Sequence, residues 1–295
     1  MAKCIDCNKR GLFLKLNKKG QCQECETSEL KRIREAAILK EAQESKAAQE
    51  ALRKKRREEY LKNKLNNAQQ ELINLPRYKM ELSSEKRKRQ TGFEPVKFSN
   101  ITPKGKYTEF VVFDTETTGL APSKDRIIEL AAIRFVDGLP TEVFETLINP
   151  QKDIPKEASS VNKITSDMVK DAPTISEILP SFESFVGNSP LIAHNLEFDL
   201  KFLYYSGSNI INDKRKFYDT LEQSRKLLKG PKSVYDKELG SWEIDYDKDY
   251  DVYDHKLETL CEYYQITIPF QHRAAADALA TGKLFLELVN EKQSR

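Results

Sequence analysis

The chain of 295 residues lacks any apolar stretch approaching the roughly 18 residues that a membrane-spanning helix requires. It also lacks the charged segment followed by an apolar segment that marks an N-terminal export signal. These absences argue against membrane insertion and against export. We therefore expect a protein of the reducing cytoplasm that has no membrane partner.

Glycine and proline are both missing between Thr27 and Leu75, and the first proline of the chain is Pro76. The stretch is rich in Ala, Glu, Lys, Arg, Gln and Leu, a composition typical of one long charged helix. Its apolar residues do not sustain a heptad repeat, so a regular coiled coil is not supported. We interpret residues 28–90 as a basic helical arm and residues 91–106, which contain two glycines and two prolines, as a linker.

Acidic residues are scarce in the first third of the chain. Residues 1–106 hold 27 Lys and Arg against 14 Asp and Glu, a net charge of +13, whereas residues 107–295 hold 22 against 32, a net charge of −10. Two basic clusters, RKKRR at 53–57 and KRKR at 86–89, lie within the arm. Basic clusters can neutralise phosphates, so the arm either binds nucleic acid or is a solvated surface helix.

The chain has five cysteines, and four of them form two CxxC pairs near the N-terminus. Cys4 and Cys7 make the first pair, Cys22 and Cys25 the second, and fourteen residues separate the pairs. Four thiolates at this spacing suit one tetrahedral, structural Zn²⁺, and a reducing compartment disfavours the alternative of disulfides. Because LFLKL and NKKG between the pairs predict a short hairpin, residues 1–27 are predicted to form a zinc finger similar to a treble-clef or zinc-ribbon module.

Residues 107–295 alternate strand and helix patterns. Three apolar strands, EFVVF, RIIELAAIRFV and TEVFETLIN, follow one another so closely that an antiparallel meander is expected. PLIAHN and KFYDT predict two more strands. Helices are expected at about 157–170, 174–186, 196–205, 220–228, 257–264 and 274–291. The predicted fold class is α/β, with a mixed five-stranded sheet flanked by helices and preceded by the zinc finger and the long charged helix.

Asp114 and Glu116 stand two residues apart at the end of the first strand, in FDTETTGL. Side chains of a strand alternate between its faces, so both carboxylates project to one side, ~7 Å apart along the backbone. They repel one another unless a cation lies between them, and Mg²⁺ or Mn²⁺ prefers such oxygen ligands. A turn would explain one acid here, but not two on the same face.

Two further motifs contain acidic residues. In AHNLEFDLKFL, Asn195 is placed to cap a helix whose first turn carries Glu197 and Asp199, although acids there also favour the positive helix end on their own account. In HRAAADALAT, His272 and Asp277 are five residues apart. Five helical residues leave two side chains ~140° apart, so we place His272 in the loop before the helix and Asp277 inside it.

Together, FDTETTGL, AHNLEFDLKFL and HRAAADA resemble the motifs of the DEDD family of 3′–5′ exonucleases, in its His-containing branch. The chain is similar to the proofreading epsilon subunit of DNA polymerase III over almost all of residues 107–295. The resemblance implies a ribonuclease-H-like fold for this exonuclease domain. It also implies release of 5′-mononucleotides from a free 3′ end of DNA, in proofreading or repair, with a polymerase or another replication or repair protein as a partner.

The resemblance implies a role for each motif residue. Two Mg²⁺ or Mn²⁺ ions would be held by four acids: Asp114, Glu116, Asp199 and Asp277. His272 would be the general base that takes a proton from the attacking water. The terminal nucleotide would contact Glu116, Thr117 and Thr118.

Several residues outside these roles have a structural interpretation. His194 is interpreted as a structural hydrogen-bonding residue, His255 as a surface residue, Cys261 as a core residue and Asp219 as a turn or cap residue. The acid-rich stretch 234–254 is interpreted as an exposed loop. A 3′–5′ exoribonuclease and a non-catalytic interaction module on a nuclease scaffold are the alternative functions.

Overall fold

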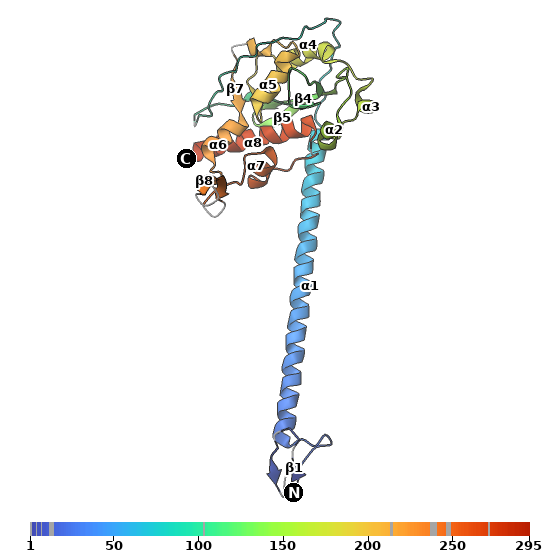
Figure 1. Ribbon diagram of the computed structural model, residues 1–295, viewed down its shortest axis with the longest axis vertical. Coiled ribbons are helices and arrows are strands. Elements are labelled where there is room, and N and C mark those ends of the chain that lie inside the picture. Colours follow the sequence, from blue (N-terminus) through green and yellow to red (C-terminus); the bar gives the residue numbers. More distant parts are fainter. Residues whose placement is uncertain are drawn as a thin grey trace. The chain divides into compact units, whose positions relative to one another are not determined.

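The protein is described by a computed structural model. It describes residues 2–3, 5–6, 8–11, 15–102, 104–212, 215–236, 241–245, 249–270 and 272–295. The chain divides into two compact units, residues 1–63 and 64–295. Helix α1 (Gln23–Ile73) contributes residues to both units (Figure 1).

The first unit begins with short antiparallel pairings. Strand β1 (Ala2–Lys3) pairs with β2 (Arg10–Gly11), and an isolated antiparallel bridge joins Leu16 to Cys22. This bridge closes a turn over NKKG, at the position of the hairpin that the sequence predicts.

The cysteines of the expected zinc finger are only partly described. Cys22 is buried, and Cys25 lies in the first turn of α1. Cys4 and Cys7 lie outside the described residues, so the four-cysteine zinc site stays a prediction.

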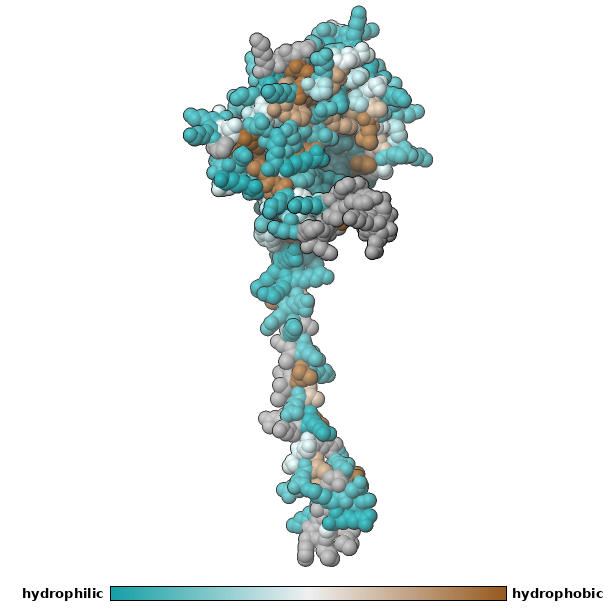
Figure 2. Space-filling model, turned by 60° about the vertical axis from the view of Figure 1, so that its left-hand side comes forward, coloured by the Kyte–Doolittle hydropathy of each residue, from teal (hydrophilic) through white to brown (hydrophobic). Residues whose placement is uncertain are grey.

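The long charged helix is present. Helix α1 ends at Ile73, three residues before Pro76, whose ring is incompatible with a helix interior. Several apolar residues on α1 are 38% to 63% exposed: Ile33, Leu39, Leu52, Tyr60, Leu61 and Leu65. Figure 2 accordingly shows a mostly hydrophilic helix surface with scattered hydrophobic side chains. In the part of α1 that the structure describes, this scatter agrees with the missing heptad repeat.

The segment after α1 differs from the predicted arm and linker. Residues 76–102, here called the strap, are not helical and pack on the sheet and helices of the second unit, to which they belong. The strap backbone forms hydrogen bonds with strands of the sheet. Tyr78 N–H donates to Val143 O at 2.8 Å, and Ser99 N–H donates to Phe217 O at 2.7 Å. Five strap side chains pack on one core cluster: Tyr78, Met80, Phe93, Val96 and Phe98. Widely spaced, partly buried apolar residues therefore anchor this segment, although its charge and its Gly and Pro residues are typical of a linker.

The second unit is built on a five-stranded sheet with the strand order β5-β4-β3-β6-β7. The strands are β3 (Glu109–Thr117), β4 (Ile127–Val136), β5 (Leu139–Leu147), β6 (Leu191–Ala193) and β7 (Phe217–Asp219). The first three form the expected antiparallel meander, whereas β6 runs parallel to β3 and β7 parallel to β6. The predicted α/β fold class, with a mixed five-stranded ribonuclease-H-like sheet, is confirmed.

Helices cover both faces of this sheet (Figure 1). They are α2 (Lys156–Asn162), α3 (Ser166–Val169), α4 (Ile175–Val186), α5 (Leu196–Tyr205), the 3-10 turn η1 (Ile210–Asn212), α6 (Thr220–Leu227), α7 (Leu257–Tyr263) and α8 (Ala274–Ser294). One core cluster joins α4 and α5 to one face, and a second joins α6, α7 and α8 to the other. None of the described helices is both long enough and apolar enough to cross a membrane.

Two local features differ from the sequence prediction. The single helix expected at 157–170 is two helices, because Lys163 adopts a left-handed conformation with φ 60° and ends α2. The acid-rich stretch is not all loop, since β8 (Lys232–Asp236) and β9 (Ser241–Asp245) pair as an antiparallel hairpin.

Small residues let α8 lie close to the sheet. The first turns of α8 contain Ala274, Ala275 and Ala276, each at most 1% exposed. A Cβ atom at Gly282 would lie 2.3 Å from the Phe135 ring of β4, which is closer than any packing allows. The Ala-rich N-terminal part of α8 is thereby held against the sheet, and Asp277 with it.

We expect Ile101→Ala to lower the free energy of unfolding by about 2 to 5 kcal/mol, because this strap residue is 3% exposed within the core cluster that includes α8. Leu82→Ala is the control, since Leu82 lies on the same strap but is 62% exposed and should change stability by about 0.5 kcal/mol or less. Urea unfolding of the full chain measures both. Equal, small effects would mean that the strap is a linker after all.

Candidate active site

The pleat of β3 decides where the two motif acids point. Phe113 belongs to the core cluster beneath α4 and α5, and Val112 belongs to the cluster beneath α8. Since side chains alternate along a strand, Asp114 and Glu116 continue the series of Val112 and face α8. The strand pattern read from the sequence thus places both carboxylates on one side.

Three carboxylates meet at the end of β3. Oxygen atoms of Asp114, Glu116 and Asp277 all lie within 4.8 Å of one another. The first two come from β3, and Asp277 comes from the first turn of α8. These three residues, here called the acid centre, form a set of hard oxygen donors that suits Mg²⁺ or Mn²⁺.

Asp199 is not one of these three residues and lies against Thr115 of β3. It is 3% exposed in the first turn of α5, and its Oδ1 accepts hydrogen bonds from Thr115 N–H at 3.1 Å and Thr115 Oγ1 at 2.6 Å. Asn195 occupies the N-cap position but is left-handed, with φ 64°, and its side chain makes no capping bond. Its N–H donates instead to Asp219 Oδ1 at 3.1 Å. The predicted capping role of the Asn195 side chain is therefore wrong.

Burial and mutual repulsion raise the pKa of these acids. For Asp114, burial is the largest cause, followed by the charges of Asp199 and Asp277. For Glu116, burial and then the charge of Glu129 raise the pKa to about 7. Burial also raises the pKa values of Asp199 and Asp277. A divalent cation would relieve this excess of negative charge, so the residues fit such an ion.

Glu129 is a residue that the sequence analysis missed. It lies on β4 directly opposite Glu116 and is fully buried. Its Oε1 accepts hydrogen bonds from Arg273 Nε at 3.0 Å and Nη2 at 2.5 Å, and its Oε2 accepts one from Ala274 N–H at 3.0 Å. The pair ties the start of α8, and therefore Asp277, to the sheet. The signal was an acid inside the apolar strand RIIELAAIRFV, since a buried charge requires a partner.

His272 lies in the loop just before α8, as expected, with a left-handed φ of 52°. The structure does not bring it into the acid centre. Among the described residues that line the adjacent cavity are two other histidines, His194 and His255, but not His272. Its role as a base stays a prediction.

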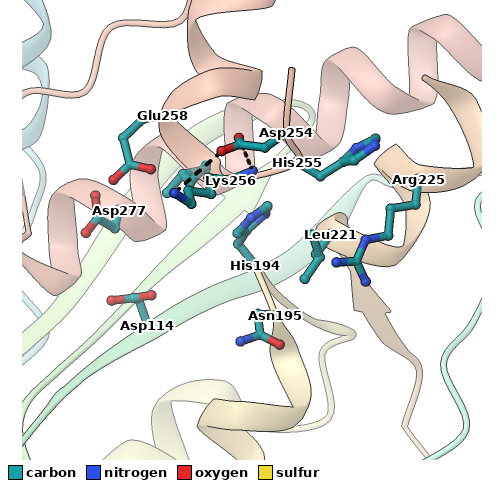
Figure 3. A pocket seen from close by; sticks show the side chains of 11 residues that line it. Asp114, His194, Asn195, Leu221, Arg225, Asp254, His255, Lys256, Glu258 and Asp277 are labelled. Atoms are coloured by element: carbon teal, nitrogen blue, oxygen red, sulfur yellow. Dashed lines mark hydrogen bonds and ion pairs between the residues drawn. The ribbon is translucent and has the colours of Figure 1, made fainter. Parts of the chain in front are cut away.

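A cavity of about 510 Å³ opens beside the acid centre. Asp114, Asp277 and Glu258 gather on one side of it, whereas Arg225 and His255 lie on the other (Figure 3). The cavity therefore offers negative charge for a cation next to positive charge for an anion.

The two cavity histidines are held by hydrogen bonds. His194 Nδ1 lies 2.9 Å from Thr220 Oγ1, and the ring also bonds to the backbone of His255. Burial lowers the pKa of His194 to about 4, so the imidazole is neutral. His255 Nδ1 lies 3.1 Å from Ser224 Oγ. The predicted structural role of His194 is confirmed. His255 is partly exposed, in agreement with a surface position, and its side chain also lines the cavity.

Two other structural assignments are confirmed. Cys261 is 2% exposed within α7. Asp219 caps α6 by accepting a hydrogen bond from Leu221 N–H at 2.9 Å.

Thr117 and Thr118 join β3 to the loop 119–126. Thr117 Oγ1 donates to Gly119 O at 2.7 Å, and Thr118 Oγ1 donates to Asp125 Oδ1 at 3.0 Å. The main chain of Thr118 also donates to Arg126 O at 2.9 Å. The two threonines predicted to meet a nucleotide are thus braced by this loop.

A mixed sheet whose central strand ends in two carboxylates, opposite a third on a packed helix, defines a ribonuclease-H-like protein with a site suited to divalent metal. Residues 111–285 match the exonuclease family (RNase_T), and the chain belongs to this family.

Similar curated proteins are described as DNA polymerase III of the PolC type. The protein of Caldanaerobacter subterraneus subsp. tengcongensis is 35% identical over 186 residues, which cover 63% of this chain and 12% of that protein. The protein of Oceanobacillus iheyensis is 37% identical over 182 residues, which cover 61% of this chain and 11% of that protein. The chain thus spans only a small part of the length of these relatives.

Solved structures of similar fold include exonuclease X in complex with 5′ overhanging duplex DNA. It has a TM-score of 0.45 and 22% identity, with 61% of this chain and 91% of that chain covered. E. coli exonuclease I in complex with a dA16 oligonucleotide has a TM-score of 0.46 and 20% identity, with 64% and 42% covered.

Glu116→Gln should stabilise the metal-free protein in a pH-dependent way. The pKa of Glu116 is about 7 in the folded protein, and about 4.3 is usual in an unfolded chain. Ionisation of Glu116 therefore destabilises the folded protein as pH rises from the unfolded pKa to the folded pKa. Above the folded pKa, the loss in unfolding free energy is on the order of 3 kcal/mol. We expect the variant to exceed the wild type in unfolding free energy by more at about pH 8 than at about pH 5.

Urea unfolding in a chelator measures this difference, and Mg²⁺ or Mn²⁺ should stabilise the wild type more than the variant. Glu94→Gln, at an exposed site on the strap, is the control. A gap between Glu116→Gln and wild type that stays constant with pH would contradict the crowding of charge.

Proposed function

We propose that the protein is a divalent-metal-dependent 3′–5′ exonuclease of the His-containing DEDD branch that releases 5′-mononucleotides from DNA. The observation that carries the proposal is the convergence of Asp114, Glu116 and Asp277 in a chain of the exonuclease family. Relatives described as DNA polymerase III support DNA as the substrate and proofreading or repair in the cytoplasm as the setting.

The acids would share two Mg²⁺ or Mn²⁺ ions. Glu116 and Asp277 would hold the first, Asp199 the second, and Asp114 would contact both. When bound, such ions supply an activated water and neutralise charge that develops on the phosphate. The hydrogen bonds from Thr115 hold Asp199 through Oδ1, which leaves Oδ2 for a ligand.

The cavity supports an anionic substrate. Arg225 is exposed at its edge and has no carboxylate partner in the described part of the chain. Its planar guanidinium can bind a phosphodiester on the side opposite the acid centre. The scissile phosphate would then lie between the acid centre and this cation, with the sugar near Thr117 and Thr118.

Proton removal would fall to His272. His194 is buried and neutral, and its ring already forms hydrogen bonds with Thr220 and with the His255 backbone. His272, by contrast, is only partly buried, and the next residue, Arg273, is anchored to Glu129. An imidazole is a common general base, so we assign this role to His272.

Digestion of 3′-end-labelled single-stranded DNA with Mg²⁺ or Mn²⁺ tests the activity. We expect labelled mononucleotide as the first product, and we expect Asp114→Asn to slow its release by roughly two to three orders of magnitude, as for loss of a preorganised electrostatic group. Asp167→Asn, at an exposed acid of α3, is the control and should retain the activity.

The same assay separates the alternatives. Release from the 5′ end would contradict the polarity, and faster digestion of a matched RNA would favour the exoribonuclease. Undiminished release by Asp114→Asn would mean that the acid centre is not the active site.

We also propose that Cys4, Cys7, Cys22 and Cys25 hold one structural Zn²⁺. Elemental analysis of the full chain should find one zinc, and the double change Cys22→Ser, Cys25→Ser should release it because two of four ligands are lost. Cys261→Ser is the control, since Cys261 lies in the core of the second unit and should leave the zinc in place. A chain with no zinc, or a double variant that keeps it, would contradict the finger.

A further inference from the structure

The strap is fastened to the helix layer next to α5. Arg87 N–H donates to Ser176 Oγ at 2.6 Å, and Arg87 Nη2 lies 3.0 Å from Glu183 Oε2. Gly207, just after α5, has a left-handed φ of 95°, and a Cβ atom there would lie 2.6 Å from Lys88 O. The strap backbone therefore lies directly on the turn that ends α5.

A second set of contacts follows immediately along the strap. Gln90 Nε2 donates to Ser208 O at 3.1 Å, and Tyr204 Oη donates to Thr91 O at 3.1 Å. The rings of Phe93 and Tyr204 meet edge to face with centroids 5.6 Å apart. The strap is thus held on both sides of residue 89.

Arg89 lies between these two anchors and reaches the loop 119–126. Its Nη2 donates to Pro122 O at 2.7 Å and to Ser123 O at 3.3 Å. Residue 89 is outside the region 111–285 that matches the exonuclease family. The strap therefore adds a guanidinium to a loop that begins directly after Thr117 and Thr118.

A second guanidinium belongs to the loop itself. Arg126 Nη1 donates to Lys124 O at 2.8 Å and Asp125 O at 2.9 Å. The Arg126 backbone N–H donates to Thr118 Oγ1 at 3.1 Å, and its carbonyl accepts the Thr118 N–H. These backbone bonds hold Arg126 beside Thr118, two residues after Glu116.

Among the described residues, the two guanidiniums bond to backbone carbonyls and not to carboxylates. Neither Arg89 nor Arg126 forms an ion pair with a carboxylate in the ranges that the structure describes. Asp125, the acid of the loop, is engaged by the Thr118 hydroxyl and by Lys152 Nζ, 3.5 Å from its Oδ1. Partial burial and the charge of Arg126 lower the pKa of Arg89. Two like charges bonded to carbonyls of the same loop would be stabilised by a bound anion.

We propose that Arg89 and Arg126 form a phosphate-binding pair that holds the sugar–phosphate backbone of the substrate strand beside the acid centre. The strap would then belong to the substrate-binding surface of the enzyme. This inference rests on the proposed nuclease function. Guanidiniums suit the role because their planar N–H groups match phosphate oxygens, and part of each group remains after the loop carbonyls are bonded.

Binding of 5′-fluorescein-labelled oligo(dT) to the full-length protein in a chelator tests the pair without cleavage. We expect Arg89→Gln and Arg126→Gln each to weaken binding about fivefold at ~0.1 M salt, because one phosphate contact on a single strand contributes ~0.7 to the salt slope. That slope should fall by the same ~0.7. Lys88→Gln is the matched control, since Lys88 is an exposed cation next to Arg89 on the strap and should lower affinity by less than about twofold.

Arg89→Lys separates a charge contact from a structural role. It keeps the positive charge, so it should retain most of the salt slope that Arg89→Gln loses. The pair would be overturned if Arg89→Lys bound oligo(dT) as weakly as Arg89→Gln does. It would also be overturned if Arg89→Gln and Lys88→Gln had the same affinity.

The same proteins separate this inference from the proposed activity. A wild type that degrades DNA while Arg89→Gln binds normally would overturn the pair alone. A wild type that binds through Arg89 but releases no nucleotide would overturn the exonuclease and leave the pair standing. A wild type that binds no DNA would overturn the pair directly.

Discussion

Repulsion among partly buried carboxylates is the constraint on which the site depends. Asp114, Glu116 and Asp277 are held within 4.8 Å of one another, and burial raises the pKa of each. Folding must therefore hold in place groups that repel one another. The counterweight is the pair formed by Glu129 and Arg273, which fastens the N-terminus of α8 to β4. A bound divalent cation would neutralise the remaining excess of negative charge, so this excess favours metal binding.

Close packing of α8 and segments outside the sheet also position residues of the site. The alanines of α8 and the absence of a side chain at Gly282 let the helix approach the sheet until Asp277 meets β3. Two hydrogen bonds from Thr115 hold Asp199 against the same strand. The strap crosses α5 and brings Arg89 to the loop after Thr118. Arg225 lines the cavity beside the acid centre, and a cation there suits a phosphodiester substrate.

Much of the fold was predictable because its signals are local. Apolar runs located the strands β3 to β7, most of which are buried on both faces. Period-3.6 patterns located most helices, since each helix buries one stripe of its own residues. Two acids on one face of β3 likewise announced a cation site. The strap was not predictable in this way, because its apolar residues are irregularly spaced among charges. The cavity position of His255 and the left-handed turn at Asn195 were missed for a related reason, since neither follows from a period.

The sequence by itself determined the α/β class, the order of the elements and the acids that could bind metal, because strand and helix periods are properties of neighbouring residues. Only the tertiary structure decided that Glu129 anchors Arg273, that His194 rather than His272 lines the cavity, and that Arg89 and Arg126 both bond to the loop 119–126. Each of these joins residues distant in the chain. Their distances are set by how helices and strap pack on the sheet, and packing depends on the whole set of side chains at once.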